Sequence, residues 1–178
     1  MSDAPAITVR LLEERDVRML IETFRFSRPH VTNHWRERKA GLRSMFVAEL
    51  DGETAGNVSF EERSDAPGML HLFALAVLPP LQNRGVGMRL IEAVEEEAAH
   101  RSLGGIDLSV AIDNEGALRL YERLDYERVG GIHENRWTWI GPEGERRDVV
   151  EDCYRFVKRF DSITGAAPGE VVHPIFGP

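Results

Sequence analysis

The alternation of apolar and polar side chains divides this chain into short segments of two kinds. Strict alternation or a short continuous apolar run predicts a strand, and apolar residues spaced three and four apart predict a helix. Helices are expected over 14–26, between Thr32 and Gly41, from the turn at 81–87 to about 100, and over 114–124. Strands are expected over 7–12, 44–50, 54–62, 69–77, 106–111, 126–132 and 148–159, with 134–140 extended. This mixed order predicts a single α/β domain.

Glycine and proline mark the connections between these segments. Asp51-Gly52 is a two-residue hairpin signal between two strands. Gly104-Gly105 is expected to terminate the preceding helix, and a turn is expected over 142–144. The run MLHLFALAV at 69–77 is nearly continuous in apolar residues, so this strand is expected at the centre of the sheet, buried on both faces.

Composition and charge narrow the function classes. The chain has 178 residues, with 30 acidic against 22 basic side chains, a formal net charge of -8 and 42% apolar residues. This is the composition of a globular domain, and its acidic balance argues against a nucleic-acid partner and weakly favours a cationic or amine ligand. No run approaches the roughly 20 apolar residues of a membrane span, and the opening MSDAPAITVR has no apolar signal segment. A cytoplasmic protein without a membrane partner is therefore expected.

Cysteine and histidine usage gives no sign of a disulfide or a metal centre. Cys153 is the only cysteine, and it is expected to pack as a small hydrophobe, with an acyl-cysteine intermediate as the alternative. His30 and His34 lack further ligands, so no metal is expected. The expected organisation is a disordered N-terminus over 1–6, one domain over 7–160 and a flexible tail over 161–178.

The segment 75–88 carries the clearest chemical signal. A central strand ends, a glycine-bearing turn follows, and a helix begins. The first turn of a helix has unpaired N–H groups at the positive end of its dipole, and Gly85 and Gly87 let a ligand approach the backbone. Arg84 adds a positive charge beside them. This pattern predicts a cradle for an anion, with a pyrophosphate as the natural guest.

The pattern separates this turn from two better-known phosphate loops. No Gly-Lys-Ser/Thr follows the turn, which excludes a P-loop. The dinucleotide fingerprint with its later acidic residue is also absent. What stands here is Q-x-x-G-x-G, made by Gln82, Gly85 and Gly87 after LAVLP, and it resembles the acyl-CoA pyrophosphate loop of the GNAT superfamily of N-acyltransferases.

A second block, over 106–130, supports the same resemblance. It has a strand, then Asn114, then A-x-x-L-Y ending at Tyr121, followed by Asp125-Tyr126 where the family usually has Gly and an aromatic residue. Asp tolerates the left-handed conformation that a Gly provides, so the turn is expected to survive. The resemblance covers about 7–160 and implies a mixed, mostly antiparallel sheet that is splayed around an acyl-CoA site and flanked by helices.

The resemblance also implies an activity and a set of donor contacts. It implies transfer of an acetyl group from acetyl-CoA to a primary amine, by direct attack in a ternary complex. Two alternatives remain, another acyl-CoA donor and a non-catalytic module that binds or senses CoA. The residues expected to contact the donor are Leu75, Val77, Gln82, Asn83, Arg84, Gly85, Val86, Gly87, Met88, Asn114 and Tyr121.

Three of the implied roles have a simpler structural alternative. Tyr121 is implied as the general acid that protonates the leaving thiolate, and otherwise is a core tyrosine on an apolar helix stripe. Asn114 is either a contact of the CoA arm or the N-cap of its helix. His71 stands five residues before Ala76, where some family members carry a Glu that acts as the general base. It is therefore the first candidate base, and otherwise is a strand histidine that faces the sheet or solvent. Glu61 and Glu62 are the next candidates.

The acceptor site is expected between the first helices and the late hairpin. Trp137 shares a strand face with Trp139, for which a core or dimer contact is the alternative. A homodimer through the late hairpin or the last strand is also expected. The candidate acceptor-binding residues are Phe26, Arg28, His30, Trp35 and Trp137.

Overall fold

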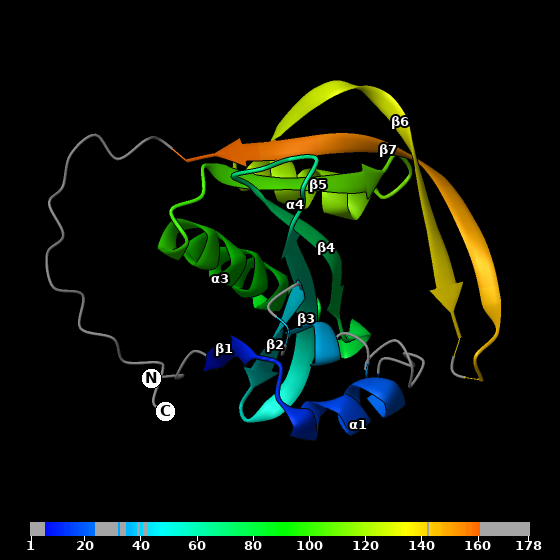
Figure 1. The fold of residues 1–178 in the computed structure, drawn as a ribbon. Helices are drawn as coiled ribbons and strands as arrows, with labels where there is room; N and C mark the ends of the chain where they lie inside the picture. Colours follow the sequence, from blue (N-terminus) through cyan, green and yellow to red (C-terminus); the bar gives the residue numbers. More distant parts are fainter. Residues whose placement is uncertain are drawn as a thin grey trace, which may run out of the picture.

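Strands and helices alternate around one sheet in the computed structural model, which describes residues 6–23, 32, 35–38, 40, 43–141 and 143–160 (Figure 1). The helices are α1 (Glu14–Thr23), α3 (Val86–His100) and α4 (Glu115–Arg123), with a short 3-10 turn at Pro79–Leu81. The strands are β1 (Ile7–Leu11), β2 (Arg43–Leu50), β3 (Glu53–Glu62), β4 (Leu70–Val77), β5 (Gly105–Ala111), β6 (Glu127–Ile140) and β7 (Arg146–Arg159).

The strands form a single sheet in the order β1-β2-β3-β4-β5-β7-β6 among the described residues. Neighbouring strands run antiparallel except β4 and β5, which are parallel. The predicted mixed, mostly antiparallel sheet with flanking helices is therefore confirmed. As predicted, β4 is the central strand of this order. The expected burial on both faces is wrong, because only Leu70 and Leu72 are buried and Ala74 is exposed.

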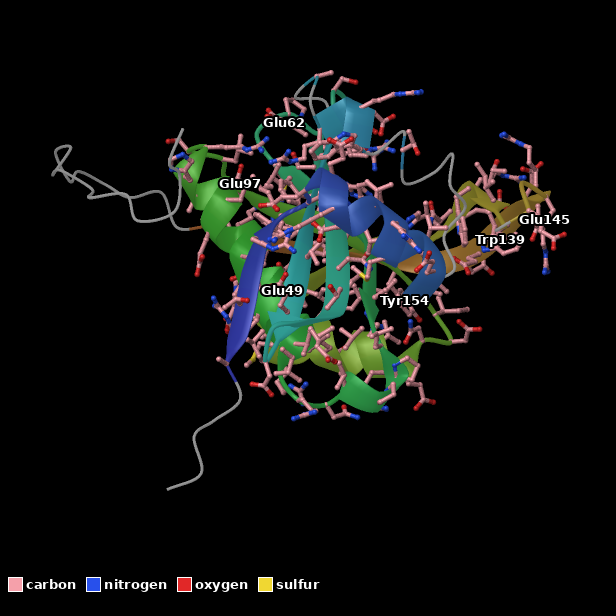
Figure 2. The ribbon with its side chains drawn as sticks, turned by 90° about the horizontal axis from the view of Figure 1, so that it is seen from below. Glu49, Glu62, Glu97, Trp139, Glu145 and Tyr154 are labelled. Atoms are coloured by element: carbon pink, nitrogen blue, oxygen red, sulfur yellow. The ribbon has the colours of Figure 1, made fainter. Side chains whose placement is uncertain are left out.

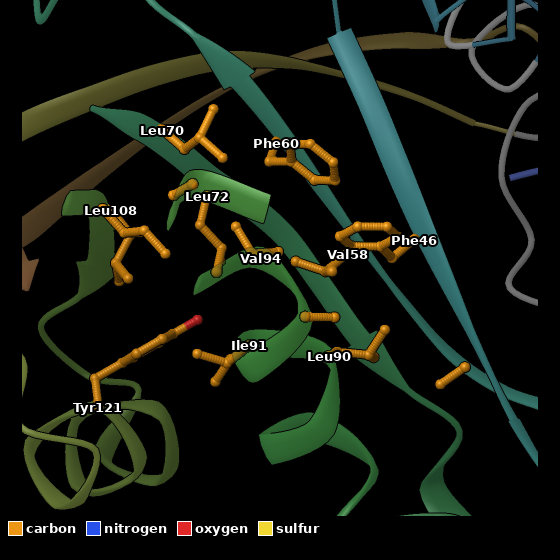
Figure 3. Packing of buried hydrophobic residues seen from close by; sticks show 14 of the residues in the cluster. Phe46, Val58, Phe60, Leu70, Leu72, Leu90, Ile91, Val94, Leu108 and Tyr121 are labelled. Atoms are coloured by element: carbon orange, nitrogen blue, oxygen red, sulfur yellow. The ribbon is translucent and has the colours of Figure 1, made fainter. Parts of the chain in front are cut away.

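One face of the sheet, here called the α3 face, packs against α3 and α4. Leu90, Ile91 and Val94 of α3 are fully buried there. Figure 3 shows them against side chains from the middle strands, with Tyr121 reaching in from α4. The strand residues of this cluster alternate along the chain, as expected for a half-buried sheet, and include Phe46, Val58, Phe60, Leu70, Leu72, Leu108 and Phe156.

The opposite face, here called the α1 face, has a smaller apolar cluster. Leu20 of α1 packs with Leu12, Met45 and Val47. Figure 2, seen from below, shows α1 lying in front of the sheet strands and α3 beyond them. The remaining positions on this face are largely polar or charged, and they carry most of the candidate chemistry.

Two turns keep their predicted form. Asp51 and Gly52 both have positive φ, 53° and 84°, as a type I′ hairpin requires. Asp125 adopts φ 63°, so aspartate does replace the family's glycine in a left-handed turn. A third prediction is wrong in detail. The helix ends at His100 with Ser102 left-handed at φ 58°, and Gly105 already belongs to β5.

The late hairpin also differs from its prediction. The expected strand 126–132 and extended segment 134–140 form one strand, β6, interrupted only by a shift of register between Val129 and His133. Gly130, at φ 71°, absorbs the irregularity. The last strand starts at Arg146 rather than 148. The far halves of β6 and β7 form a two-stranded arm that bends away from the sheet toward the side where α1 lies (Figure 1).

In the described part of the chain, no helix is long and apolar enough to cross a membrane. Residues 32 and 35–38 are helical, which agrees with the helix expected between Thr32 and Gly41. The flexible ends predicted from the sequence fall mainly outside the described residues, which begin at 6 and end at 160.

Candidate functional site

The two central strands separate in the middle of the sheet. β4 and β5 pair only at Leu70 with Ile106 and at His71 with Asp107. Beyond that point β4 carries one extra residue relative to β3, because Asn57 faces Ala76 while Ser59 already faces Phe73.

The extra residue lies at Ala74, whose φ of 51° is left-handed. Such a bulge bends its strand away from its neighbour. Past His71 and Asp107 the backbone edges of β4 and β5 do not pair with one another. This interruption of the ladder, here called the slot, leaves backbone groups with which the amide groups of an extended ligand could pair.

The turn after β4 has the predicted anion-binding form. Asn83 and Gly85 are both left-handed, with φ of 60° and 87°. Gly85 is the N-cap of the 15-residue helix α3 and gives it no side-chain cap. The N–H groups of Val86, Gly87 and Met88 therefore remain available to a bound anion at the positive end of the helix dipole.

The residues around this turn divide into backbone and side-chain roles. The side chain of Gln82 donates to the carbonyl oxygen of Val77 at 3.2 Å, which ties the turn back to the end of β4. Leu75 and Val77 pack on the core of the α3 face, so only their backbone can serve a ligand in the slot. Arg84 and Met88 are exposed beside the turn.

At the closed end of the slot, His71 is paired with a buried carboxylate. Nδ1 of His71 lies 3.3 Å from Oδ1 of Asp107, and Nε of Arg155 donates to Oδ2 of the same residue at 3.1 Å. Burial alone would raise the pKa of Asp107, but the hydrogen bond with His71 and the charges of His71 and Arg155 outweigh it and hold this pKa below its ordinary value. Asp107 thus stays ionised and fixes the ring of His71.

The two glutamates proposed as alternative bases lie on different faces of the sheet. Glu61 is the register partner of His71 on β3, and its carboxylate accepts from Nε of Arg43 at 2.6 Å. Glu62 is exposed at the end of β3 and pairs with Leu70, so alternation directs it away from the face that carries His71. The structure therefore brings Glu61, but not Glu62, beside the candidate base.

Tyr121 lies on the α3 face of the sheet, opposite the face that carries His71. Only 4% of it is exposed, and its ring packs against Tyr126 and Phe156. Figure 3 shows its hydroxyl end turned toward Ile91 and Leu72, and Leu72 directly follows His71. Burial raises the pKa of Tyr121, so the phenol keeps its proton at neutral pH. No hydrogen bond to its hydroxyl is found among the residues that the structure describes.

Asn114 caps a helix, as one of its two predicted roles requires, and its contact with the CoA arm stays a prediction. It is the N-cap of α4, and its side-chain oxygen accepts from the backbone N–H of Ala117 at 3.1 Å. Cys153 is buried, and burial raises the pKa of its thiol, which keeps it in the unreactive protonated form. The expectation that this cysteine packs as a small hydrophobe agrees with its position.

The acceptor candidates are only partly placed. Trp35 packs against the small apolar cluster around Leu20 on the α1 face. Trp137 is 43% exposed and Trp139 39%, so neither belongs to the core. With Arg147 and Val149 they line a shallow hollow of about 270 Å³ on the arm. Phe26, Arg28, His30 and His34 lie outside the described residues.

Sequence reasoning missed several polar residues on the α1 face. Asp107 and Arg155 reach His71 only through the register of β5 with β4 and β7, which no local pattern encodes. Asn57 and Ser59 on β3 are fully buried, and their side-chain polar atoms have no hydrogen-bond partner among the described residues. A polar pair in a run of otherwise buried strand positions was the available signal.

Comparisons with known proteins agree with this geometry. A mycothiol acetyltransferase from Rhodococcus jostii is 37% identical over 92 residues, which are 50% of this chain and 30% of that protein. The matches cover 60%, 45% and 53% of three further curated relatives, so the chain spans about half the length of such relatives.

Two solved structures share the fold. The ribosomal-protein-S18-alanine N-acetyltransferase from Escherichia coli has a TM-score of 0.65 at 21% identity, covering 94% of this chain and 99% of that chain. A Salmonella typhimurium protein solved with its cofactor acetyl-CoA has a TM-score of 0.65 at 16% identity, covering 93% and 99%. At these identities the likeness shows the fold alone. The sequence profile of the Acetyltransferase (GNAT) family matches residues 9–126, more than half of the chain, and the chain therefore belongs to that family.

Proposed function

We propose that this chain is an acetyl-CoA-dependent N-acetyltransferase that acts on a primary amine. The observation that carries the proposal is the slot between β4 and β5. It opens directly beyond His71 and Asp107 and leads along β4 to the uncapped turn at Gly85. One continuous path thus joins an anion cradle to a candidate general base.

The slot suits the donor in two ways. The pantetheine arm of CoA carries amide groups that can pair with the free edge of β4 as an added strand would. Its pyrophosphate fits the N–H groups at the start of α3, with the exposed Arg84 nearby. The structural likeness to the Salmonella typhimurium protein solved with acetyl-CoA supports this placement.

His71 is the general base of the proposed mechanism. Asp107 holds Nδ1 as the protonated nitrogen, which leaves the lone pair of Nε2 to take a proton from the acceptor ammonium. Glu61 lies beside this pair and is neutralised by Arg43. We assign Glu61 an electrostatic role near the base, and Glu62 no role in catalysis.

The chemical step then needs an oxyanion donor and an acid. The free amine attacks the thioester carbonyl, and a backbone N–H of β4 beyond the bulge stabilises the oxyanion. Tyr121 supplies the proton to the departing thiolate from the α3 face. Starting from the ammonium form, the overall change forms one N–C bond and breaks one C–S bond. One nitrogen proton leaves through His71 to solvent, and the second, lost after the attack, replaces the proton that Tyr121 gives to sulfur.

The acceptor enters from the α1 face. Alternation along β7 puts Val149 on the same face as Arg155, and Trp137 pairs with Val149 on the arm. We therefore propose Trp35 and Trp137 as part of the acceptor wall, and one catalytic domain over 7–160. The cytoplasmic location and a homodimer through the arm remain predictions.

The test begins with calorimetric titration of acetyl-CoA, free CoA, propionyl-CoA and succinyl-CoA, with Gly85→Glu as the control. Gly85 is left-handed and borders the cradle, so a glutamate there adds strain and a repelling charge. Tight binding of acetyl-CoA that Gly85→Glu abolishes supports the donor site. Tighter binding of a longer acyl-CoA favours the alternative donor, and binding of acetyl-CoA without thiol release for any amine favours a sensing module.

The acid role has its own test. Tyr121→Phe keeps the ring and removes only the hydroxyl. We expect kcat to fall by about 10²-fold or more while acetyl-CoA binding is kept. A Tyr121→Phe protein with full kcat would refute the assignment and leave Tyr121 as a core residue.

A further inference from the structure

Two buried polar side chains lie beside the proposed base without a structural purpose of their own. Asn57 and Ser59 are 0% exposed, yet within the part of the chain that the structure describes, Oδ1 and Nδ2 of Asn57 and Oγ of Ser59 have no hydrogen-bond partner. An unpaired polar group in the interior costs about 1–3 kcal/mol, so most such groups in native proteins are paired. A pair of them on one strand therefore calls for a ligand to complete it.

The side chains of Asn57 and Ser59 point to the α1 face, from which the acceptor is proposed to enter. Val58 and Phe60 point into the α3 face, as Figure 3 shows. Because side chains alternate along a strand, Asn57 and Ser59 point to the α1 face. Glu61 continues the same row and is the register partner of His71.

The row is close to the reacting centre. Ser59 faces Phe73, which is two residues beyond His71 and stacks on its ring with centroids 5.8 Å apart. Diagonal neighbours on one face of an antiparallel pair lie about 7–8 Å apart. A group that bonds to Ser59 and Asn57 thus belongs to the acceptor, a few atoms from its amine.

The surroundings of the pair select a neutral group. The register neighbours of Asn57 and Ser59 are Val47, Met45, Ala76 and Phe73, none of them charged. The nearby arginines of this face are already paired, Arg43 with Glu61 and Arg155 with Asp107. Among the described residues, the strand neighbours of the pair offer no positive charge to neutralise a buried carboxylate, whereas an amide group can both donate and accept hydrogen bonds.

We infer that Asn57 and Ser59 form a recognition site for a neutral amide group next to the acceptor amine, so that the preferred acceptors are amino-amides. The inference rests on the proposed function, since it assigns the substrate class of the same site. It gives the two unpaired side chains their partners only when the acceptor is bound.

The test uses three amines with the same number of non-hydrogen atoms. Glycinamide carries the amide, glycine a carboxylate, and isobutylamine an apolar group of similar shape. With the full chain and saturating acetyl-CoA, kcat/KM is measured for each amine from the release of the CoA thiol. The amines differ in basicity, so the quantity compared is the change in preference between wild type and variants.

The variants are Asn57→Leu and Ser59→Ala. In each, we expect the preference for glycinamide over isobutylamine to fall by about 10- to 100-fold. The thermal midpoint should stay equal or rise, because an unpaired buried group is removed. Ser44→Ala, on β2 opposite Phe60 and hence on the α3 face, is the matched control and should keep the preference.

The opposite results are equally clear. A lower thermal midpoint with an unchanged preference in Asn57→Leu and Ser59→Ala gives the pair a structural role and overturns the inference. Wild type that prefers glycine or shows no thiol release with glycinamide overturns it as well. The acetyl-CoA titration with Gly85→Glu separately decides whether the donor site exists, so the two proposals can fail independently.

Discussion

The two faces of the sheet use the same strands for different purposes. Toward α3, strand side chains such as Phe60 and Leu72 are apolar and at most 2% exposed. Toward α1, the intervening positions of the same strands carry Glu61, His71 and Asn57. One face gains its stability from packing, and the other keeps polar groups at sites where packing alone would have favoured apolar side chains.

The comparison indicates that packing on the α3 face supplies stability, whereas the side chains on the α1 face supply the candidate chemistry. Polar side chains form a row across the α1 face, in which Arg43 pairs with Glu61, and Asp107 lies between the imidazole of His71 and the guanidinium of Arg155. Each buried carboxylate is neutralised by a neighbour, which makes the polar row tolerable. Mutations on the α3 face should therefore change stability, and those in the row should change activity.

The largest expected effect is on catalysis, from His71→Gln. Removing the base should lower kcat by about 10²- to 10⁴-fold. The free energy of unfolding should change little, because a glutamine amide can still donate to Asp107 and Arg155 still pairs with that carboxylate. The measurement is the rate of CoA thiol release beside chemical denaturation. His133→Gln is the control, since that ring bonds to Ser109 at 3.1 Å and takes no part in the mechanism. Equal losses in both variants would contradict the assignment.

Phe60→Ala should destabilise the protein by leaving a cavity in the core of the α3 face. Phe60 is 1% exposed and packs with Phe46 at a centroid distance of 4.8 Å. Truncation should lower the free energy of unfolding by about 3–5 kcal/mol, as measured by urea denaturation. The protein that stays folded should keep its kcat. Val150→Ala, on the exposed arm, should change stability by less than about 0.5 kcal/mol.

Lowering the pH should reduce the free energy of unfolding, because Asp107 loses the charge that pairs with His71 and Arg155. Its folded-state pKa lies below the ordinary 3.8, so its charge stabilises the fold above that value and the contribution is lost as the pH falls through the folded pKa. Asp107→Asn has no charge at this position and therefore lacks this pH-dependent stabilisation. The stability gap between wild type and Asp107→Asn should therefore narrow between pH 5 and pH 3. A gap of constant size over that range would show that Asp107 makes no favourable pairing.

The smallest effect is expected at Asn114. Asn114→Ala should cost about 1 kcal/mol of stability through loss of the helix cap, with the affinity for acetyl-CoA unchanged. Asn114→Ser should restore most of the stability. If Asn114→Ala instead weakens acetyl-CoA binding and leaves stability intact, the residue contacts the donor rather than capping α4.

The sequence predicts the parts of the fold that depend on local patterns. The hairpin at Asp51-Gly52, the strands and helices of the α3 face and the turn at Gly85 all follow from periodicity and glycine placement. The resemblance over 75–88 and 106–130 correctly identifies the family. Asp125 adopts the left-handed turn because a short polar side chain tolerates it.

The remainder depends on contacts between distant segments. Ala74 has no preference for φ 51°, so the bulge that opens the slot is imposed by the pairing of β4 with β3. The sequence predicts two segments, 126–132 and 134–140, but pairing with the long strand β7 joins them into β6. The partner of His71 is 36 residues away in sequence, so only the register of β5 reveals it.

The bulge at Ala74 leaves the sheet with a gap at its centre, where most proteins have their strongest ladder. On the proposed function, the arm of acetyl-CoA fills that gap and turns two half-sheets into one. Ligand binding would then act as the last folding step, adding about 2.7 kcal/mol when the donor is present at 100 times its Kd. The lifetime of such a protein in the cell would rise and fall with the supply of its own substrate.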